Sequence, residues 1–385
     1  MKSVSNTYDG RSDEPGDTYD GRSDEPSDTY DVRPYEPGDR DEILSLYELV
    51  FGETKDPEWF AWKYEDNPYV DHVPILVATT EGTVVGARPF FALCMSCNHA
   101  RDVVLQPCDA MVHPEHRRQG LFTRMTERAI ERYQGDCRYF FNFPNHRSLP
   151  GNRKLGWRSV SELVFHYRIE NPGRVAAARS DRASVQLASR LGTVLARGYY
   201  RLRDALSSPP PEISIRVEDG IPAEQLTALY RSSVPDGVHV ARDERFYGWR
   251  FGNPEWRYTT YLAESEAGVE AALTAGTSTG SGLNATRIVD VVPTENTPED
   301  VHGALLDGVL TDQSDTDIFC TREQGLSGTA LRDFGFHRND TFPLSLVATR
   351  TTQVVRTLTE EWEHHDVDVT DPDNWCLTFA EFDTS

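Results

Sequence analysis

Apolar positions in the first third of the chain change from helical spacing to the dense spacing of strands. Ile43, Leu44, Tyr47 and Val50 recur at helical spacing, which predicts an amphipathic helix. Asp39 precedes this segment and can cap the helix, and the acidic residues at 41 and 42 suit the positive end of its dipole. A helix is therefore expected near the start of the first domain.

A second helix and several strands follow. Pro57 at the first helical position favours a helix beginning at Asp56, and Asn67-Pro68 ends it. Segments rich in β-branched and aromatic residues predict strands near 75–80, 84–93 and 103–112.

Residues 174–206 place apolar side chains at steps of three or four with arginines between them. We interpret residues 171–211 as a helical linker. The alternative is a basic helix that meets an anionic surface, but the segment ends at three prolines, 209–211, and leads directly into a strand-like segment at 213–217. This placement favours a connection between domains.

The second half repeats the first in outline. Residues 60–68 (FAWKYEDNP) resemble residues 247–254 (YGWRFGNP), and Leu155-Gly156-Trp157 is echoed by Phe334-Gly335-Phe336. Such internal similarity indicates a duplicated domain, and 385 residues are enough for two cores. We expect domains at 29–170 and 212–350, with a C-terminal tail, 351–385, that packs back on them.

An eleven-residue repeat opens the chain, with copies beginning at Thr7, Thr18 and Thr29. Only the third copy gains apolar residues, Val32 and Tyr35, and predicts a short strand. The first two copies have too little apolar area to offset the entropy of ordering. Residues 1–28 are therefore expected to be a disordered tail.

The charge is strongly negative. The formal net charge is −23, and all but four of the 39 Lys and Arg residues are arginines. This composition resembles the solubility surface of a halophilic protein and disfavours a nucleic-acid or anionic-membrane partner. The chain has neither a stretch of about 20 apolar residues nor a secretory signal, so a cytoplasmic location is expected.

The six cysteines are scattered along the chain, which fits a reducing compartment without disulfides. Cys94 and Cys97 form one C-x-x-C with His99 nearby, but a zinc site needs about four ligands and no second pair follows. We expect no bound metal.

The segment 109–122 carries the chemical signal. An apolar strand leads into a cationic loop containing Arg117, Arg118 and Gly120, and a helix follows over about 120–134. The first turn of a helix has unpaired N–H groups and the positive end of the dipole, so it can bind a pyrophosphate. Gly120 allows a phosphate to approach the backbone closely, and the arginines add charge.

The spacing of this loop to later elements resembles the GNAT acetyltransferase superfamily, with a tandem arrangement similar to the enhanced-intracellular-survival type. That family's pattern of V-x-P-x-x-R-x-x-G, a strand, N-x-x-A/S and K-x-G-F is matched in order. The matching residues are Val112, Pro114, Arg117, Gly120, Asn145, Ser148, Lys154, Gly156 and Trp157. The resemblance covers about 30–170, with a weaker echo over 212–350. It implies a mixed α/β (α+β) fold of two GNAT-like domains, each a twisted central sheet flanked by helices, with the second degenerate.

The resemblance also implies where acetyl-CoA, the expected cosubstrate, binds. Its pantetheine would pair with the backbone near Met111, Val112 and His113, in a cleft where two parallel strands splay apart. Its pyrophosphate would meet Arg117, Arg118, Gln119, Gly120, Leu121 and Phe122. Asn145 and Ser148 would complete the wall of the cofactor site.

Two residues depart from the family pattern. Phe122 stands where a Gly or Ala is usual, and Asn152 stands where many members place the tyrosine that protonates the leaving thiolate. An amide can hydrogen-bond the sulfur but cannot act as an acid, so the tyrosine mechanism is weakened. The sequence offers four candidates for the general base: Asp109, His113, Glu162 and the C-terminal carboxylate of Ser385.

The second half lacks the phosphate loop. The segment after Val292 leads into Pro298-Glu299-Asp300, and an acidic helix start would repel a pyrophosphate. We expect no CoA there. Tyr247, Trp249 and Trp256 could close the acceptor site, although core packing explains them better.

The expected function is acetyl transfer from acetyl-CoA to a primary amine of a small molecule or peptide. One alternative is an aminoacyl transferase of the FemAB kind, with charged tRNA as donor, which the acidic charge disfavours. Another is a catalytically silent CoA-binding or scaffold protein, for which Asn152 and the lack of an obvious base argue. The sequence identifies neither the acceptor nor the oligomeric state, and a homo-oligomer is one possibility.

Overall fold

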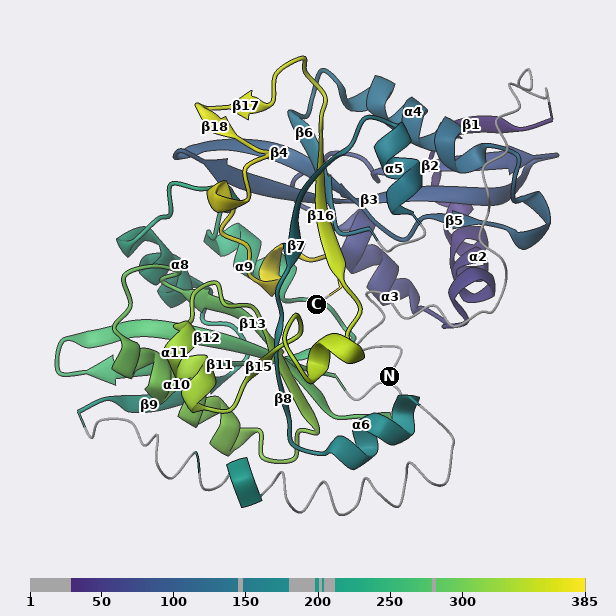
Figure 1. Ribbon diagram of the computed structural model, residues 1–385. Coiled ribbons are helices and arrows are strands. Elements are labelled where there is room, and N and C mark those ends of the chain that lie inside the picture. The colour runs from purple at the N-terminus through teal and green to yellow at the C-terminus, as the bar shows by residue number, and fades with distance from the viewer. Residues whose placement is uncertain are drawn as a thin grey trace. The chain divides into compact units, whose positions relative to one another are not determined.

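The computed structural model describes residues 29–144, 148–179, 198–200, 203, 212–278 and 282–384 (Figure 1). These residues form two compact units, each built from separate stretches of chain. We call the unit that contains the described residues up to Ser161 and Thr351–Asn374 the N-terminal unit. The C-terminal unit contains Glu162–Arg350 and Trp375–Ser385, and each unit is described by itself.

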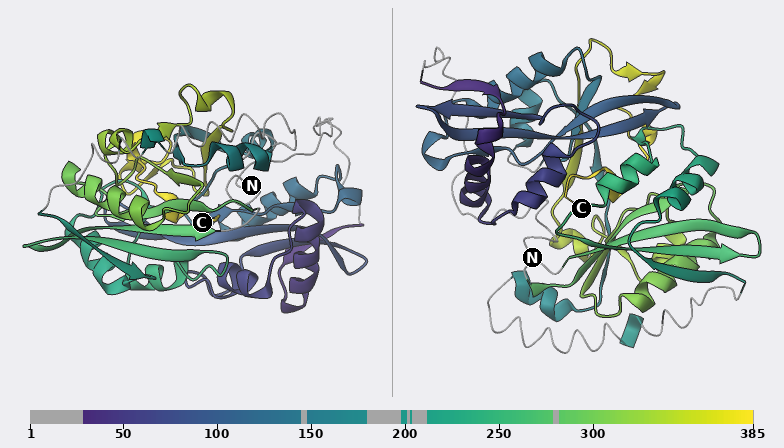
Figure 2. Two further views of the ribbon diagram at one scale, coloured as in Figure 1. Left: turned by 90° about the horizontal axis from the view of Figure 1, so that it is seen from below. Right: turned by 180° about the vertical axis from the view of Figure 1, so that it is seen from behind.

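The N-terminal unit is a sheet with strand order β1-β2-β3-β4-β6-β16-β7, and β5 pairs with β3. Helices α2 and α3 lie on one face and α4 on the other (Figure 2). The bounds of its elements are β1 Asp31–Pro34, α2 Arg40–Phe51, α3 Pro57–Phe60, a π-helical turn Ala61–Glu65, β2 Ile75–Thr80, β3 Thr83–Cys97, β4 Ala100–Pro107, β5 Met111–Val112, α4 Leu121–Tyr133, β6 Tyr139–Asn142, α5 Leu149–Lys154, β7 Arg158–Leu163 and β16 Thr351–Thr357.

The C-terminal unit is a second sheet, with order β15-β8-β14-β13-β12-β11-β9. Two short strands elsewhere in the chain, β17 Glu363–His364 and β18 Val367–Asp368, form a hairpin in the N-terminal unit. The bounds of the C-terminal unit are β8 His166–Ile169, α6 Pro172–Arg179, β9 Ser214–Asp219, α8 Ala223–Ser232, β10 His239–Val240, α9 Glu244–Arg250, β11 Arg257–Ser265, β12 Gly268–Ser278, β13 Ala285–Val292, α10 Glu299–Asp312, β14 Ile318–Thr321, α11 Gly328–Asp333 and β15 His337–Arg338.

The two sheets exchange strands along the chain. β16 comes from the C-terminal part of the sequence and pairs antiparallel with β6 in the N-terminal unit, from Val354 opposite Asn142 to Thr357 opposite Tyr139. β8 follows the N-terminal unit in sequence and pairs antiparallel with β14 in the C-terminal unit. One cut along the chain therefore does not separate the units, and the domain boundaries expected from the sequence stay predictions.

Apart from short turns and the two-residue strands β5 and β10, both units repeat one order of elements: a strand, two helices, three strands, a helix, a strand and a short helix. Small details recur with this order. The buried Asn67 and Asn253 each accept a hydrogen bond from the backbone N–H two residues later, at 3.0 and 3.1 Å. Gly156 and Gly335 both adopt a left-handed conformation, with φ of 84° and 75°, after a short helix. The expected fold class, mixed α/β with two similar domains, is confirmed.

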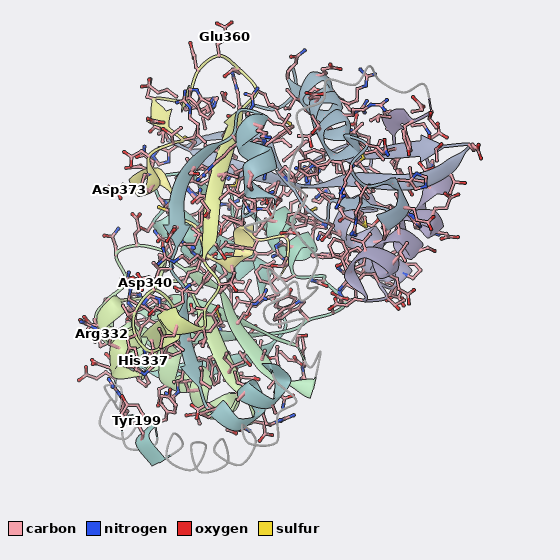
Figure 3. All side chains as sticks on the ribbon, turned by 45° about the vertical axis from the view of Figure 1, so that its right-hand side comes forward. Tyr199, Arg332, His337, Asp340, Glu360 and Asp373 are labelled. Atoms are coloured by element: carbon pink, nitrogen blue, oxygen red, sulfur yellow. The ribbon has the colours of Figure 1, made fainter. Side chains whose placement is uncertain are left out.

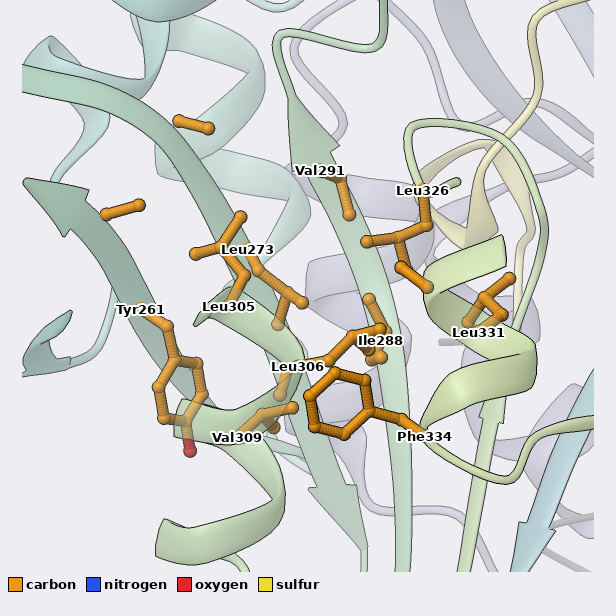
Figure 4. Packing of buried hydrophobic residues seen from close by; sticks show 14 of the residues in the cluster. Tyr261, Leu273, Ile288, Val291, Leu305, Leu306, Val309, Leu326, Leu331 and Phe334 are labelled. Atoms are coloured by element: carbon orange, nitrogen blue, oxygen red, sulfur yellow. The ribbon is translucent and has the colours of Figure 1, made fainter. Parts of the chain in front are cut away.

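Each unit has its own apolar core. In the C-terminal unit, buried residues of β11, β12 and β13 pack against α10 and α11, with Leu305, Leu306 and Phe334 at the centre of the contact (Figure 4). In the N-terminal unit, α4 buries Leu121, Met125 and other side chains of one face against the sheet. The polar face of α4 is left to solvent, as the helical spacing of its apolar residues requires.

Most sequence-predicted elements are present, and one cap differs. Asp56 caps α3 by accepting a hydrogen bond from the N–H of Glu58 at 2.9 Å. Asp39 precedes α2 but does not cap it with its side chain. Its carboxylate instead binds the guanidinium of Arg33 and the N–H of Glu36, both at 2.7 Å, because a cation and a turn lie closer than the helix.

The expected linker, 171–211, is described only at α6, 198–200 and 203, and the first two N-terminal repeats lie outside the described residues.

Side chains at the surface include Asp340, which pairs with Arg338 at 2.8 Å, and Glu360 (Figure 3). Among the described residues, no helix has the length and apolar character needed to cross a membrane.

The core of the C-terminal unit predicts a large effect of truncating Leu305, which is fully buried in it. Leu305→Ala removes apolar area and leaves a cavity, so we expect the free energy of unfolding to fall by about 2–5 kcal/mol in denaturant titrations. Leu346→Ala is the matched control, because Leu346 is 75% exposed. We expect the control to change stability by less than about 0.5 kcal/mol, and equal losses in the two variants would contradict the assigned core.

Candidate functional site

One extra residue interrupts the pairing of β3 with the strand that faces it. Phe90 pairs with Pro107 in β4, and Ala87 pairs with Met111 in β5, so three residues of one strand face two of the other. Asp109 within this bulge has a φ of +40°. The N–H of Cys108 still donates to Pro89 O at 3.0 Å, and the N–H of His113 donates to Val85 O at 2.8 Å. The bulge thus bends the strand without releasing it from β3.

The other edge of this strand opens beside the bulge. β4 and β6 run parallel, and their described register holds one pair, Leu105 with Phe140. Beyond this pair β4 enters the bulge, while β6 continues to Asn142. The two parallel strands therefore diverge next to Met111 and Val112, where the sequence predicts that the pantetheine arm binds.

The predicted phosphate loop forms the start of α4. Gly120 is the N-cap residue, with a φ of 70°, and Arg118 also has a positive φ, 65°. A Cβ built on Gly120 meets no atom within 4 Å, so the backbone here faces open space. Arg117, Arg118 and Gln119 are exposed, and the first turn of α4 contains no acidic residue. This combination suits a phosphate group.

The other residues predicted to bind the cofactor differ in burial and position. Met111 and Leu121 are buried, and Phe122 is partly buried in the first turn of α4. Ser148 is the N-cap residue of α5, and Asn145 lies outside the described residues.

Asn152 on α5 is a buried amide without partners. It is only 1% exposed, and neither its Oδ1 nor its Nδ2 has a hydrogen-bond partner among the described residues. Burying a polar group without a partner is costly, so such an amide indicates a polar atom of a ligand.

Arg88 is a residue of this site that the sequence analysis missed. It lies on β3 opposite the bulge and is 3% exposed. Its Nε and Nη2 have no hydrogen-bond partner among the described residues, and its guanidinium lies 4.8 Å from the centre of the Phe122 ring. The signal was available in the sequence, because an arginine in the apolar strand 84–93 needs an explanation.

A buried ion pair holds Asp109. The Nζ of Lys63 and the hydroxyl of Tyr64 both donate to its Oδ2 at 2.6 Å. Burial opposes ionisation of Asp109, but the ammonium of Lys63 and these hydrogen bonds outweigh it and lower the pKa of the carboxyl. Burial, followed by the charge of Asp109, raises the pKa of Tyr64 well above its ordinary value.

The other candidate bases have different surroundings. His113 is half-buried at the end of β5, and its Nδ1 accepts the N–H of Glu115 at 3.2 Å. Glu162 is exposed and pairs with Arg350 at 2.9 Å within the C-terminal unit. Ser385 lies outside the described residues, although Arg287 binds Thr384 O at 2.7 Å. Asp109 and His113 belong to the N-terminal unit, and Glu162 belongs to the C-terminal unit.

The C-terminal unit contains a buried ion-pair network of its own. Arg242, fully buried, pairs with Asp290 of β13 at 2.9 Å and with Glu381 at 3.0 Å. Tyr247 is 1% exposed and donates to Asp290 at 3.1 Å, and Trp249 is also buried, so both are core residues. α10 begins with two acidic residues, as the sequence indicated.

Comparisons with known proteins agree with this geometry. Residues 31–160 match the family model described as an acetyltransferase (GNAT) domain. No curated protein matches the chain in sequence.

Several solved structures are similar over 86% of this chain. They are a GCN5-related N-acetyltransferase from Anabaena variabilis (10% identity, 73% of that chain, TM-score 0.56), a conserved protein from Enterococcus faecalis described as a probable N-acyltransferase (11%, 72%, 0.58) and a GCN5-related N-acetyltransferase from Kribbella flavida (14%, 71%, 0.53). At these identities the likeness shows the fold alone. The N-terminal unit therefore contains a GNAT acetyltransferase domain, and the narrower resemblance to the enhanced-intracellular-survival type stays a prediction.

Proposed function

We propose that this chain is an N-acetyltransferase that moves an acetyl group from acetyl-CoA to a primary amine. The observation that carries the proposal is the combination, within a matched GNAT domain, of a bulged strand, a diverging parallel neighbour and a cationic helix start. A thioester arm fits between the strands, and its diphosphate fits at Gly120.

Two orphaned side chains support a long, polar cosubstrate. Asn152 and Arg88 are both almost fully buried and both have unpartnered polar atoms. The amide groups of the pantetheine arm can hydrogen-bond the amide of Asn152, and the thioester end can accept a hydrogen bond from the guanidinium of Arg88. A purely apolar occupant would leave these groups unsatisfied.

The reaction needs three contributions from the protein. The amine nitrogen attacks the acyl carbon, backbone N–H groups at the bulge stabilise the negative oxygen, and the carbon–sulfur bond breaks as thiolate leaves. The proton lost by the amine passes to a base or to water.

The pairing of Asp109 argues for a structural role. Its lowered pKa makes it a weak base, and its oxygen already accepts two short hydrogen bonds. His113 directly follows β5, beside the expected acyl position, and an imidazole nitrogen can accept a proton from an amine, so we favour it as the base. Glu162 and the carboxylate of Ser385 are the further candidates.

The acceptor is proposed to be a cationic small molecule or peptide amine, because a chain with a net charge of −23 attracts cations. The same charge opposes a tRNA donor, since nucleic-acid binding requires many neutralised phosphates. We also propose that the protein is cytoplasmic, comes from a halophile and forms a homo-oligomer.

A silent CoA-binding protein is the second candidate function, favoured by Asn152 in place of an acid. It shares the cofactor site with the enzyme. A screen of amine acceptors for the release of free thiol from acetyl-CoA separates the two, because only an enzyme releases CoA when an acceptor is added.

Substitution of Gly120 tests the cofactor site. Gly120→Glu places a carboxylate at the helix start, so we expect the affinity for acetyl-CoA to fall at least about tenfold in calorimetric titrations at high salt. Gly120→Ala is the control, since it shares the strain of a positive φ without the charge. An equal loss in both variants would assign the effect to strain, and no binding to the wild type would overturn the proposal.

Substitution of Asp109 tests its structural role. Asp109→Asn removes the carboxylate that pairs with the buried Lys63 ammonium at 2.6 Å, so we expect the free energy of unfolding to fall by about 3–5 kcal/mol near neutral pH. The folded-state pKa is lowered, so this stability is present above the unfolded pKa and is lost as pH falls through the folded pKa. The difference between wild type and variant should therefore shrink under acid conditions.

The control is Asp71→Asn, which removes an exposed carboxylate that pairs with His72. We expect no measurable change in its denaturation midpoint. A stability difference for Asp109→Asn that stays constant down to low pH would contradict the ion pair as its cause.

A further inference from the structure

Arg88 points from the sheet into the layer between β3 and the start of α4. Side chains alternate along a strand, so residues 86, 88 and 90 share one face. A Cβ built on Gly86 would lie 3.2 Å from Met125 of α4, which identifies that face. The guanidinium of Arg88 lies 4.8 Å from the ring centre of Phe122 and 5.7 Å from that of Phe90. Phe122 belongs to the first turn of α4.

This buried cation lacks the partner that its position requires. Arg88 is 3% exposed, with Nε and Nη2 unpartnered among the described residues. An arginine on this protein's interior normally finds acceptors: Arg242, for example, pairs with two carboxylates. A buried cation without them is costly, which points to an acceptor supplied by a ligand.

A second orphaned group borders the same ring. A Cβ built on Gly151 would lie 3.4 Å from Cε1 of Phe122, so α5 contacts the ring that Arg88 stacks on. Asn152, the next residue of α5, also has both side-chain polar atoms unpartnered. The Phe122 ring is thus flanked by two elements that each present a buried, unpartnered polar side chain.

Because Arg88 and Asn152 are buried, they can contact only the part of the cosubstrate that enters the interior. The exposed Arg117 and Arg118 suit the diphosphate, which stays at the rim. The buried end of an acyl-CoA is the thioester, and its sulfur becomes an anion when acyl transfer occurs. Arg88 lies opposite the bulge and approaches it from the α4 face.

We propose that Arg88 is a catalytic residue that donates a hydrogen bond to the sulfur of acyl-CoA and stabilises the thiolate as it leaves. This rests on the proposed function. The amine nitrogen forms a bond to the acyl carbon, the carbon–sulfur bond breaks with its electron pair going to sulfur, and the amine proton goes to the base. A fixed cation in a buried site stabilises the charge that develops on sulfur.

Arg88 acts as a fixed charge and not as the acid. Burial lowers the pKa of its guanidinium to about 10, so it keeps its proton at neutral pH. CoA can therefore leave as thiolate and take its proton from water. The role of the tyrosine that Asn152 replaces is divided between an amide on α5 and a cation on β3.

A comparison of CoA with desulfo-CoA, which lacks the thiol, tests the proposal without an acceptor. Both ligands are titrated calorimetrically into the full chain at about pH 6.5 and about pH 9.5, on either side of an ordinary thiol pKa of about 8.5. We expect wild-type protein to gain at least about tenfold in preference for CoA over desulfo-CoA as the pH rises, since a thiol pKa lowered by one unit corresponds to tenfold. Ultraviolet absorbance of the bound thiolate gives the same pKa independently.

The variants separate a direct contact from a structural role. Arg88→Met should remove the pH-dependent preference and leave the affinity for desulfo-CoA unchanged, while Arg88→Lys, which keeps the charge, should retain part of it. Arg132→Met, an exposed arginine of the same helix layer, is the control and should behave as wild type.

The outcomes are distinguishable. If wild-type protein binds CoA without any pH-dependent preference over desulfo-CoA, Arg88 does not contact sulfur and the inference is overturned, even where Arg88→Met fails to fold. Equal weakening of both ligands by Arg88→Met also overturns it. If neither ligand binds wild type, the proposed function itself fails.

Discussion

The bulge between Pro107 and Met111 is the constraint on which the site depends. One residue more than the partner strand can accommodate ends the ladder of β4, turns Asp109 to a positive φ and lets β6 diverge. A bulge with a positive φ costs free energy unless neighbouring residues stabilise it. Here Lys63 and Tyr64 stabilise it by donating hydrogen bonds to the Asp109 carboxylate. Both residues come from the π-helical turn after α3. The second helix of the unit therefore fixes the shape of the strand that faces the cosubstrate.

The two units share one fold but differ in how the charges of their arginines are balanced. In the N-terminal unit, two guanidinium nitrogens of the buried Arg88 have no partner among the described residues, and Arg117 and Arg118 of the loop are exposed. In the C-terminal unit Arg242 is neutralised by Asp290 and Glu381. Arg250 there donates to the main-chain carbonyls of Ala380 and Phe382, and the Nε of Arg322 donates to that of Leu377. Buried hydrogen-bond networks of this kind make the unit rigid.

The sequence predicted what local patterns determine. The apolar spacing gave α4 to within a residue or two, and the loop motif placed Gly120 at its start. The same patterns could not give the pairing of Asp109 with Lys63, because the two residues are 46 positions apart in the sequence. Arg88 was missed for a related reason: its environment is built by a helix from elsewhere in the chain. The cap expected at Asp39 was wrong because Arg33 competes for the same carboxylate.

The exchange of strands has a consequence for how the protein is made. During synthesis, everything up to β7 of the N-terminal unit leaves the ribosome nearly 200 residues before β16 does. Until then β6 presents an unpaired edge in a sheet that already contains the cosubstrate loop, and unpaired edges are prone to mistaken pairing. The order of translation therefore delays the completion of the first sheet until most of the C-terminal unit has been made, so that a ribosome that stalls before β16 yields a chain whose first sheet is unfinished.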